Sequence, residues 1–298
     1  MIELNIIGCG RAARTLARLW LQAGAVRVGG VLNRSADSAR AACDFIGAGR
    51  AWSAWPVGLP PEPSESSESS VSSRLWLLGT GDDVLVEAAA QLHASGLLQP
   101  QDGVFQLSGF SPSAGLVAAL GGHSRVASLH PVLSFADPQR ACMQFAGTLC
   151  GLEGEAALCR QLEALVVAVR GECFAVEAQH KPLYHAGSVF ASNFLVVLME
   201  LAQDSYRAAG VPPAVARRLS DALARKALDN VHAQGPAAAL TGPAARGDYR
   251  TLAVQQQAVS ANDAAHGEAY AALTALALRL AGRSPVTFPS APPAPTSR

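Results

Sequence analysis

A glycine-containing turn near the start of the sequence constrains the fold more than any other feature. Residues 4–17 read LNIIGCGRAARTLA, in which an apolar run leads into Gly8, Gly10 and Ala13 with the spacing G-x-G-x-x-A. The run predicts a buried strand, and the apolar positions of residues 11–22 predict a helix after the turn. In such a unit the first glycine permits the sharp turn, the second lets a diphosphate approach the backbone, and the small third residue lets the helix pack closely.

The start of this helix is a predicted anion site. The amides of Arg11, Ala12 and Ala13 lie in the first helical turn, where the helix dipole also favours negative charge. Residues 26–32 predict a second buried strand, which adds the context that a dinucleotide site requires. The alternative is a tight turn with a purely structural role.

The end of the second strand indicates which dinucleotide would bind. An NAD site usually has Asp or Glu there to accept from the ribose 2′-hydroxyl, whereas this sequence has Asn33, Arg34 and Ser35. Arg34 can pair with a 2′-phosphate and stack on adenine, and the other two can donate hydrogen bonds. We therefore expect NADP(H) as the cofactor. The alternative is an ordinary cap for the next helix.

Further apolar runs alternate with helical segments. Strands are predicted at residues 74–79, 103–107, 125–129, 147–152 and 173–176, and helices at 36–47, 84–95 and 155–169, with Asp82 or Asp83 as an N-cap. This alternation predicts an α/β, Rossmann-like doubly wound sheet, in which strand ends face the ligand crevice. We expect Thr80, Gly81 and Ser108 beside the cofactor and His130 beside the substrate; the alternative for His130 is a hydrogen-bonded structural role.

The sequence changes character after residue 178. Helices are predicted at residues 182–209, 213–234, 249–265 and 268–281, with no strand-like run among them. We expect a nucleotide-binding domain at 1–178, an all-α domain at 179–283 and a loose proline-rich tail at 284–298. A serine-, proline- and glutamate-rich stretch at about 56–73 is predicted to be a mobile insertion.

Composition excludes several classes of function. The 23 basic and 23 acidic residues give a formal net charge of zero, and no basic block is present, so nucleic acid is not an expected partner. No secretory leader or uninterrupted membrane span is recognised, and the six scattered cysteines are typical of free thiols in a reducing compartment. We therefore expect a cytoplasmic protein without a metal site or membrane contact.

A polar stripe opens the first helix of the all-α region. Lys181, His185, Ser188 and Ser192 share one helical face, with Asn193 on its flank. Reduction of a carbonyl or imine needs a proton donor, a role that Lys181 or His185 can fill while the serines and Asn193 orient the substrate. The alternative is a solvated helix face.

A second polar segment lies at residues 240–251, LTGPAARGDYRT. Thr241 is a predicted helix cap, and Arg246 offers a guanidinium to a substrate carboxylate. A plain turn between two capped helices is an equally good interpretation.

These motifs together resemble those of a known family. The resemblance rests on the G-x-G-x-x-A turn, Leu129-His130-Pro131, Lys181 with Tyr184-His185, Phe190-Ala191-Ser192-Asn193, and Leu240-Thr241-Gly242-Pro243 with Arg246-Gly247-Asp248. The sequence is similar to a bacterial DUF2520-type family, whose Rossmann-like domain precedes a helical domain of unassigned function. That family is similar in turn to NADP-dependent ketopantoate, pyrroline-5-carboxylate and 6-phosphogluconate-type reductases.

The resemblance carries its own expectations. In the wider group a lysine followed four residues later by asparagine serves proton donation and substrate binding; here Lys181 matches, but His185 replaces the asparagine. The Thr241 turn is similar to the carboxylate-binding helix entrance of pyrroline-carboxylate reductases, although it lacks their paired threonines. A homodimer formed through the helical domain is also implied.

We therefore expect an NADP-dependent oxidoreductase that reduces a small carbonyl compound bearing a carboxylate, with ketopantoate as the leading candidate. An imine reductase or a prephenate-type dehydrogenase is the alternative within the enzyme class. A regulatory protein that binds NADP(H) without turnover is the alternative outside it.

Overall fold

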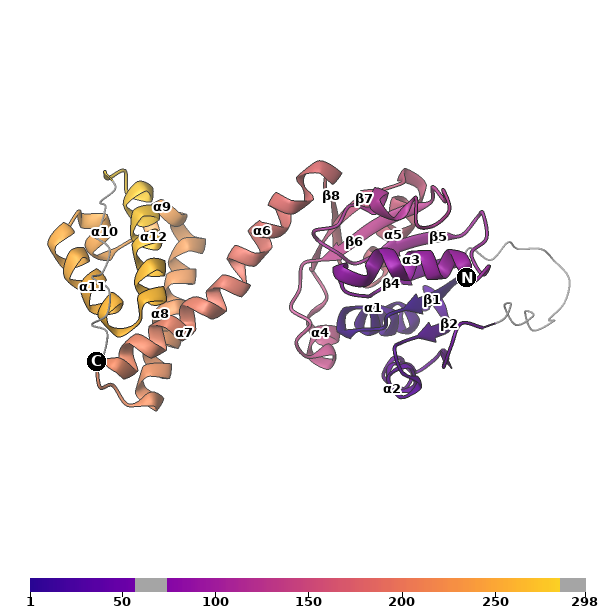
Figure 1. Cartoon of the computed structure of the whole chain (residues 1–298), viewed down its shortest axis with the longest axis horizontal. Coiled ribbons are helices and arrows are strands. Elements are labelled where there is room, and N and C mark those ends of the chain that lie inside the picture. Colours follow the sequence, from indigo (N-terminus) through magenta and orange to yellow (C-terminus); the bar gives the residue numbers. More distant parts are fainter. Residues whose placement is uncertain (57–73, 285–298) are drawn as a thin grey trace, which may run out of the picture. The chain divides into compact units, whose positions relative to one another are not determined.

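The chain forms two compact units in the computed structural model (Figure 1), Met1–Val189 and Phe190–Arg298. The structure describes residues 1–56 and 74–284. All but the first residue of the predicted insertion, and all but the first residue of the predicted tail, therefore lie outside the described residues. The two units are treated separately below.

The first unit is built on a sheet of eight strands in the order β3-β2-β1-β4-β5-β6-β7-β8. These are β1 (Ile2–Ile7), β2 (Val26–Leu32), β3 (Arg50–Trp52), β4 (Arg74–Leu78), β5 (Gly103–Gln106), β6 (Val126–Pro131), β7 (Leu149–Gly154) and β8 (Glu172–Ala175). The strands from β3 to β6 are parallel, β7 runs antiparallel to β6, and β8 is parallel to β7. This arrangement confirms the predicted Rossmann-like α/β fold.

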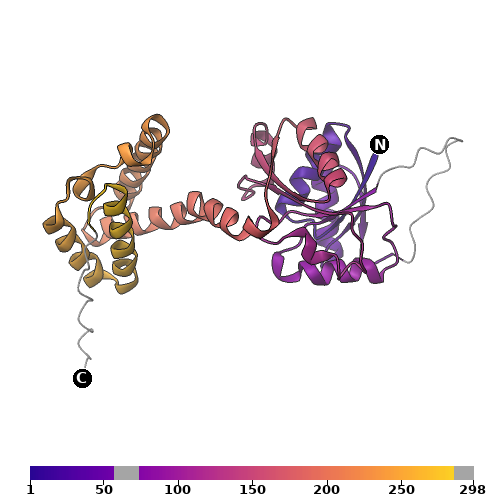
Figure 2. The ribbon, with the colours of Figure 1, turned by 90° about the horizontal axis from the view of Figure 1, so that it is seen from above.

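Helices lie on both sides of this sheet (Figure 2). They are α1 (Arg11–Gln22), α2 (Ala36–Ile46), α3 (Leu85–Ala94), α4 (Pro138–Gln144) and α5 (Ala156–Ala168), with short 3-10 turns η1 (Asp82–Val84), η2 (Ser113–Leu116) and η3 (Ala178–His180). One core contains Trp20 of α1 against Phe105, and the other contains Trp52 against Trp76. Burial on both faces explains why the parallel strands read as nearly continuous apolar runs.

Two local expectations were wrong. Neither Asp82 nor Asp83 caps a helix through its side chain, because Gly81 occupies the cap of η1 and the Asp82 carboxylate instead accepts a hydrogen bond from Ser111 Oγ at 2.9 Å. His130 does not follow its strand but lies within β6, since the antiparallel β7 extends the pairing and sets His130 opposite Gly151.

The boundary between the units lies after Val189 rather than near residue 178. The predicted helix at 182–209 is divided into α6 (Lys181–Ala191) and α7 (Asn193–Ala208), and Ser192 between them has the non-helical angles φ −126° and ψ −65°. The start of α6 packs on the sheet through side chains described below, which places this part of the helix with the first unit.

The second unit, over its described residues, contains helices and no strand, as predicted. It contains α7, α8 (Pro213–Gln234), α9 (Pro236–Ala239), α10 (Gly242–Arg246), α11 (Tyr249–Asn262) and α12 (Ala264–Leu280), with α7 packed on α8 and α11 on α12. Among its described residues the buried hydrophobic side chains are Ala216, Ala244, Leu252 and Leu278. Many larger apolar residues are exposed instead, including Phe190, Phe194, Val196, Val197, Leu223 and Val254.

One described segment, Ala178–Ala208, passes a length and hydropathy test for a membrane span, with a mean hydropathy of 1.4 over its most apolar window. Its N-terminal part, from Lys181 to Val189, belongs to the folded first unit. Ser192 interrupts the helix, and Glu200, Asp204 and Arg207 follow within α7.

Candidate functional site

The glycine turn has the backbone geometry that its sequence predicts. Gly8 has a φ of +77°, and a Cβ atom there would overlap with Cγ2 of Thr80 and lie 2.9 Å from the Thr80 amide nitrogen. A Cβ on Gly79 would lie 2.5 Å from the Gly8 carbonyl oxygen and 2.8 Å from Cβ of Ala13. The turn, the end of β4 and the start of α1 therefore pack closely because all three positions are small.

The N-terminus of α1 lies directly after this turn. Gly10 occupies its N-cap without a side-chain hydrogen bond, and Gly10 and Arg11 are exposed. Arg11 donates to the Ala136 carbonyl at 3.3 Å, and Arg14 donates to the carbonyls of Cys9 and Gly10. The half-buried Ala12 adds no bulk at this helix start. A helix N-terminus of this kind fits a diphosphate.

The three residues of the predicted 2′-phosphate site, at the end of β2, have two different environments. The Asn33 side chain accepts from the Cys9 amide at 2.6 Å and donates to Ser38 Oγ, while Ser35 Oγ caps α2 by accepting from the Ser38 amide. Asn33 and Ser35 thus hold the turn and the helix together, as the capping alternative proposed. Arg34 is exposed between them, and no acid occupies the strand end.

Thr80 and Ser108 follow the next two strands of the sheet. The Thr80 hydroxyl is buried and has no hydrogen-bond partner among the described residues. Ser108 Oγ accepts from the amides of Phe110 and Ser111 and so forms a local turn, while its carbonyl accepts from Ser128 Oγ at 3.0 Å. Of the two, Thr80 keeps an unsatisfied polar group next to the glycine turn.

A buried row of polar side chains crosses three strands and was not predicted. Gln106, Ser128 and Glu153 are register neighbours on β5, β6 and β7. The Glu153 carboxylate accepts from the Ser113 amide and hydroxyl, both at 2.8 Å. The signal in the sequence is a polar residue inside each otherwise apolar strand, but alignment of the three requires the register, which the sequence does not reveal.

Lys181 binds to this row from the first residue of α6. Its ammonium donates to the Ser108 carbonyl at 2.9 Å and to Ser128 Oγ at 2.5 Å, and lies 3.8 Å from Glu153. The residue is only 2% exposed, and burial lowers the pKa of its ammonium while the nearby Glu153 and Asp82 oppose this effect. The Lys181 ammonium thus links the segment after β5 to β6 and β7.

One turn further along α6, two side chains contact His130. The Tyr184 hydroxyl lies 2.7 Å from His130 Nδ1, and the His185 ring packs edge-on against the His130 ring with centroids 5.5 Å apart. Burial, His185 and Lys181 together lower the pKa of His130 to about 4, with Asp82 acting in the opposite direction. His130 is therefore a neutral imidazole at physiological pH, and Tyr184 is a contact that the sequence reasoning missed.

Two glycines make room for this cluster. A Cβ on Gly109 would lie 2.5 Å from His185 Nδ1 and 2.8 Å from His130 Nε2, and a Cβ on Gly151 would lie 2.9 Å from the Tyr184 hydroxyl. His185 Nδ1 is also buried, and no residue in the described part of the chain forms a hydrogen bond with it. The cluster lies at the carboxyl end of β6, and β1, β4, β5 and β6 are successive neighbours in the sheet. The glycine turn and the cluster therefore lie along the same edge.

The remaining predicted residues lie farther along the chain. Ser188 is half-buried on α6, whereas Ser192 and Asn193 belong to the second unit, where Ser192 Oγ donates to Asn193 Oδ1 at 3.0 Å. Thr241 occupies the N-cap of α10 but makes no side-chain cap, and Arg246 is exposed in its last turn. The structure thus brings together His130 and His185, and adds Tyr184 to them.

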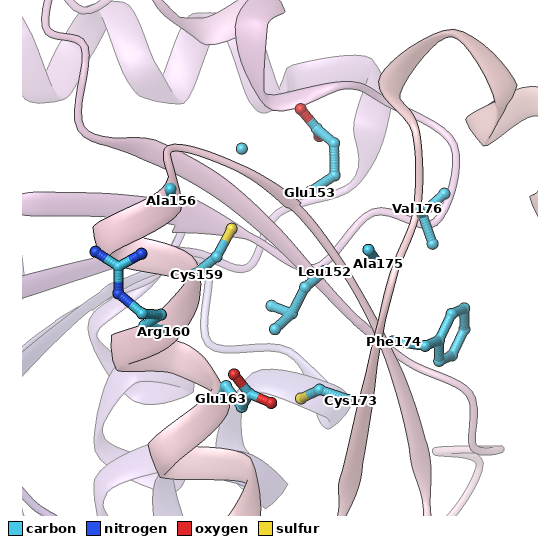
Figure 3. Close-up of a pocket in the computed structure, with 11 residues that line it drawn as sticks. Leu152, Glu153, Ala156, Cys159, Arg160, Glu163, Cys173, Phe174, Ala175 and Val176 are labelled. Carbon is cyan, nitrogen blue, oxygen red and sulfur yellow. The ribbon is translucent and has the colours of Figure 1, made fainter.

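A cavity of about 390 Å³ lies elsewhere in the first unit, lined by α5, β7 and β8 (Figure 3). Cys159, Arg160 and Glu163 come from α5, and Cys173 and Phe174 come from β8. Burial raises the pKa of each of the two thiols to about 11, so both are protonated and weakly nucleophilic at physiological pH. This cavity lacks the proton donors and glycine turn of the strand-end site.

Several solved structures share the fold over nearly the whole chain. Protein TM1727 from Thermotoga maritima is 25% identical with a TM-score of 0.66, covering 94% of this chain and 98% of that one. A putative NADP oxidoreductase, BF3122 from Bacteroides fragilis, is 20% identical with a TM-score of 0.71, covering 93% and 98%. An imine reductase from Myxococcus stipitatus in complex with NADP⁺ is 15% identical with a TM-score of 0.61, covering 93% of each chain.

Sequence comparison identifies one domain. No curated protein matches the sequence. Residues 148–277, which run from β7 through most of the helical unit, match DUF2520, a domain of unknown function. The chain therefore has a Rossmann-like fold, and its residues 148–277 match the DUF2520 domain.

Proposed function

We propose that the protein is an NADP(H)-dependent oxidoreductase that reduces a small carbonyl compound. The observation that carries this proposal is the placement of two features on one sheet edge. The glycine turn follows β1, and the cluster of His130, Tyr184 and His185 lies at the end of β6. A dinucleotide bound across the ends of parallel strands has its diphosphate at such a turn and its reactive ring farther along the edge.

The residues present fit NADP(H). The uncapped start of α1 accepts a diphosphate, and the exposed Arg34, with no neighbouring acid, suits a 2′-phosphate. The unsatisfied Thr80 hydroxyl offers a further hydrogen bond beside the turn. When bound, the reduced nicotinamide supplies the hydride, and the protein supplies orientation and a proton. The putative NADP oxidoreductase from Bacteroides fragilis and the imine reductase from Myxococcus stipitatus, in complex with NADP⁺, support this cofactor.

The reaction class rests on the chemistry of the cluster. A carbonyl oxygen that gains negative charge during reduction needs a hydrogen-bond donor, and neutral imidazole and phenol groups are donors. Ketopantoate is the leading candidate substrate. A cyclic imine or a prephenate-type substrate is the alternative within the enzyme class, and NADP(H)-dependent regulation without turnover is the alternative outside it.

Lys181 takes a different role in this proposal from the proton donation expected of it. Its ammonium already contacts Ser108, Ser128 and Glu153. We assign it to positioning, because these contacts fix the start of α6, and hence Tyr184 and His185, on the sheet. The proton donor is then His130 or His185.

The helical unit supports a homodimer. Its exposed apolar side chains lie on α7, α8, α11 and α12, while its own buried hydrophobic residues are few among those described. Obligate dimer interfaces resemble a domain core divided between two subunits, and a chain with zero formal net charge does not repel its own copy. A second copy of this chain is therefore the proposed occupant.

The proposed function is tested by measuring NADPH oxidation by the purified protein with ketopantoate, then with a panel of 2-oxo acids and cyclic imines. Saturable consumption with a 2-oxo acid supports the proposal. Tight NADPH binding without oxidation by any acceptor would favour the regulatory alternative.

The cofactor preference has its own test. Arg34→Ala removes the 2′-phosphate partner and is expected to weaken NADPH binding about 10- to 100-fold, since a hydrogen bond to a charged group contributes about 1.5–3 kcal/mol. NADH affinity, measured by the same fluorescence titration, should stay unchanged. Equal losses for both nucleotides would contradict the assignment.

A further inference from the structure

The hydrogen bond between Tyr184 and His130 has a direction that the surroundings determine. The two atoms, Tyr184 Oη and His130 Nδ1, are 2.7 Å apart. A phenol is a stronger hydrogen-bond donor than imidazole, and an imidazole nitrogen is the stronger acceptor. Among the described residues, Tyr184 Oη has no other hydrogen-bond acceptor. Tyr184 therefore donates, and a neutral His130 carries its proton on Nε2.

The Nε2 atom has no hydrogen-bond partner among residues 1–56 and 74–284, and it lies at the edge of the ring that faces Gly109. His130 is only partly buried, and Nε2 is not among the buried unpaired atoms of the described residues, so a ligand at the strand ends can reach it. We infer that Tyr184 and His130 form a proton relay, in which His130 Nε2 protonates the oxygen of a bound carbonyl substrate and Tyr184 restores the proton at Nδ1. This inference rests on the proposed function.

The charges around His130 favour such a relay over simple acid catalysis by an imidazolium. Burial and the nearby His185 and Lys181 outweigh Asp82 and lower the pKa of His130 to about 4, so no imidazolium is available near neutral pH. Burial raises the pKa of Tyr184 to about 12, which keeps the phenol protonated. The resting state is thus a neutral pair, and the proton must come through it.

The relay balances in protons and electrons. A bound reduced nicotinamide would supply hydride to the carbonyl carbon, and the electron pair of the C=O π bond would move to oxygen. That oxygen takes the Nε2 proton as Nδ1 takes the phenolic proton, so the imidazole remains neutral and Tyr184 becomes a phenolate. Because an alkoxide is a much stronger base than a phenolate, the transfer is favourable, and water then returns a proton to Tyr184.

This chemistry selects a class of substrate. A carbonyl oxygen has lone pairs that accept a hydrogen bond from Nε2–H, and its negative charge increases as reduction proceeds. A protonated imine has no lone pair on nitrogen and cannot accept this hydrogen bond. The relay therefore favours ketones and 2-oxo acids over iminium substrates, with the alcohol as product.

The first test measures the position of the imidazole proton in the full-length protein without an acceptor. Nitrogen-15-labelled histidine distinguishes a protonated from an unprotonated ring nitrogen, and loss of the signal in His130→Asn assigns it among the seven histidines. At neutral pH we expect the proton on Nε2. Tyr184→Phe should give a mixture of tautomers, whereas Tyr206→Phe, on α7 of the second unit, should leave the spectrum unchanged.

A proton on Nδ1 in the unsubstituted protein, or a spectrum that Tyr184→Phe does not alter, would overturn the relay. If Tyr184→Phe fails to fold, the spectrum of the unsubstituted protein still decides. This result is independent of turnover, so a wrong substrate class would not obscure it.

The second test uses the oxidation assay with the best carbonyl acceptor. Tyr184→Phe is expected to lower kcat about 10²- to 10⁴-fold, the usual contribution of general acid catalysis, with KM and NADPH affinity nearly unchanged. Tyr206→Phe should keep full activity. An unchanged kcat in Tyr184→Phe would refute the relay even if the protein is a reductase, whereas absence of oxidation by the unsubstituted protein would refute the proposed function alone.

Discussion

The two units of this chain bury their apolar residues in different ways. The first unit has a hydrophobic core on each face of its sheet, with Trp20, Trp76 and Phe105 fully enclosed. The second unit, in the residues described, encloses little more than Ala244, Leu252 and Leu278 in its own cluster. The first unit thus encloses its large apolar side chains in its own cores, whereas the described helices of the second leave many of theirs exposed, which is the observation behind the proposed dimer.

The largest effect is expected from closing the glycine turn of the first unit. Gly8→Ala places a Cβ against Thr80 at a φ of +77°, so both steric overlap and an unfavourable backbone conformation oppose it. We expect a loss of about 3 kcal/mol or more in the free energy of unfolding, measured with urea, and loss of NADPH binding.

Gly24→Ala is the matched control. Gly24 also has a positive φ, +67°, but a Cβ there meets nothing within 4 Å. Gly24→Ala should lower the free energy of unfolding by only about 1–2 kcal/mol, which is the contribution of the backbone conformation alone. It should leave NADPH affinity unchanged. If the two variants lost equal stability, the close packing at Gly8 would not matter.

The next effect concerns the buried charge that joins α6 to the sheet. Lys181→Met keeps the length of the side chain but removes the ammonium from Ser108, Ser128 and Glu153. We expect the free energy of unfolding to fall by about 3 kcal/mol, because a buried carboxylate loses its cationic neighbour.

The other lysine of the sequence provides the control for this change. Lys226 is exposed on α8, so Lys226→Met should alter stability by no more than about 0.5 kcal/mol. Adding Glu153→Gln to Lys181→Met should recover part of the loss, since the unpaired charge is then removed. Similar urea midpoints for the two lysine variants would contradict the buried network.

A third test compares two valines of similar exposure, one in each unit. Val197 on α7 is 53% exposed and Val86 on α3 is 56% exposed. If a second copy covers the helical unit, Val197→Glu buries a charge and should weaken dimerisation at least about 100-fold, as a cost of several kcal/mol implies. Val86→Glu should leave the sedimentation profile unchanged. If the unsubstituted protein sediments as a monomer at micromolar concentration, the proposal of a dimer is wrong.

The sequence determines much of the first unit because its signals are local. Both termini of β2 and the start of α1 were predicted correctly, since buried parallel strands read as apolar runs and the glycine turn separates the strand from the helix. The three-residue β3 and the seven-residue α4 were missed, because such short elements have too few residues for a periodic pattern.

The candidate site was only partly predictable for a different reason. His130 and His185 were recognised by residue type, but their contact, and that of Tyr184, depends on the antiparallel pairing of β6 with β7. The expected donor role of Lys181 followed from its position in the sequence, whereas its partners come from the segment after β5 and from β6 and β7. Such long-range register is a property of the folded sheet and leaves no local pattern.

The fit of α6 against two glycines also sets where this chain can be divided for engineering. Tyr184 and His185 occupy places that Gly151 and Gly109 leave open, and Lys181 binds Ser108 and Ser128, so a shift of α6 by one residue would misplace all three. A chimera that exchanges the helical unit for one from another protein should therefore be joined after Val189. A junction at residue 178 would replace α6, whose first residues pack on the sheet.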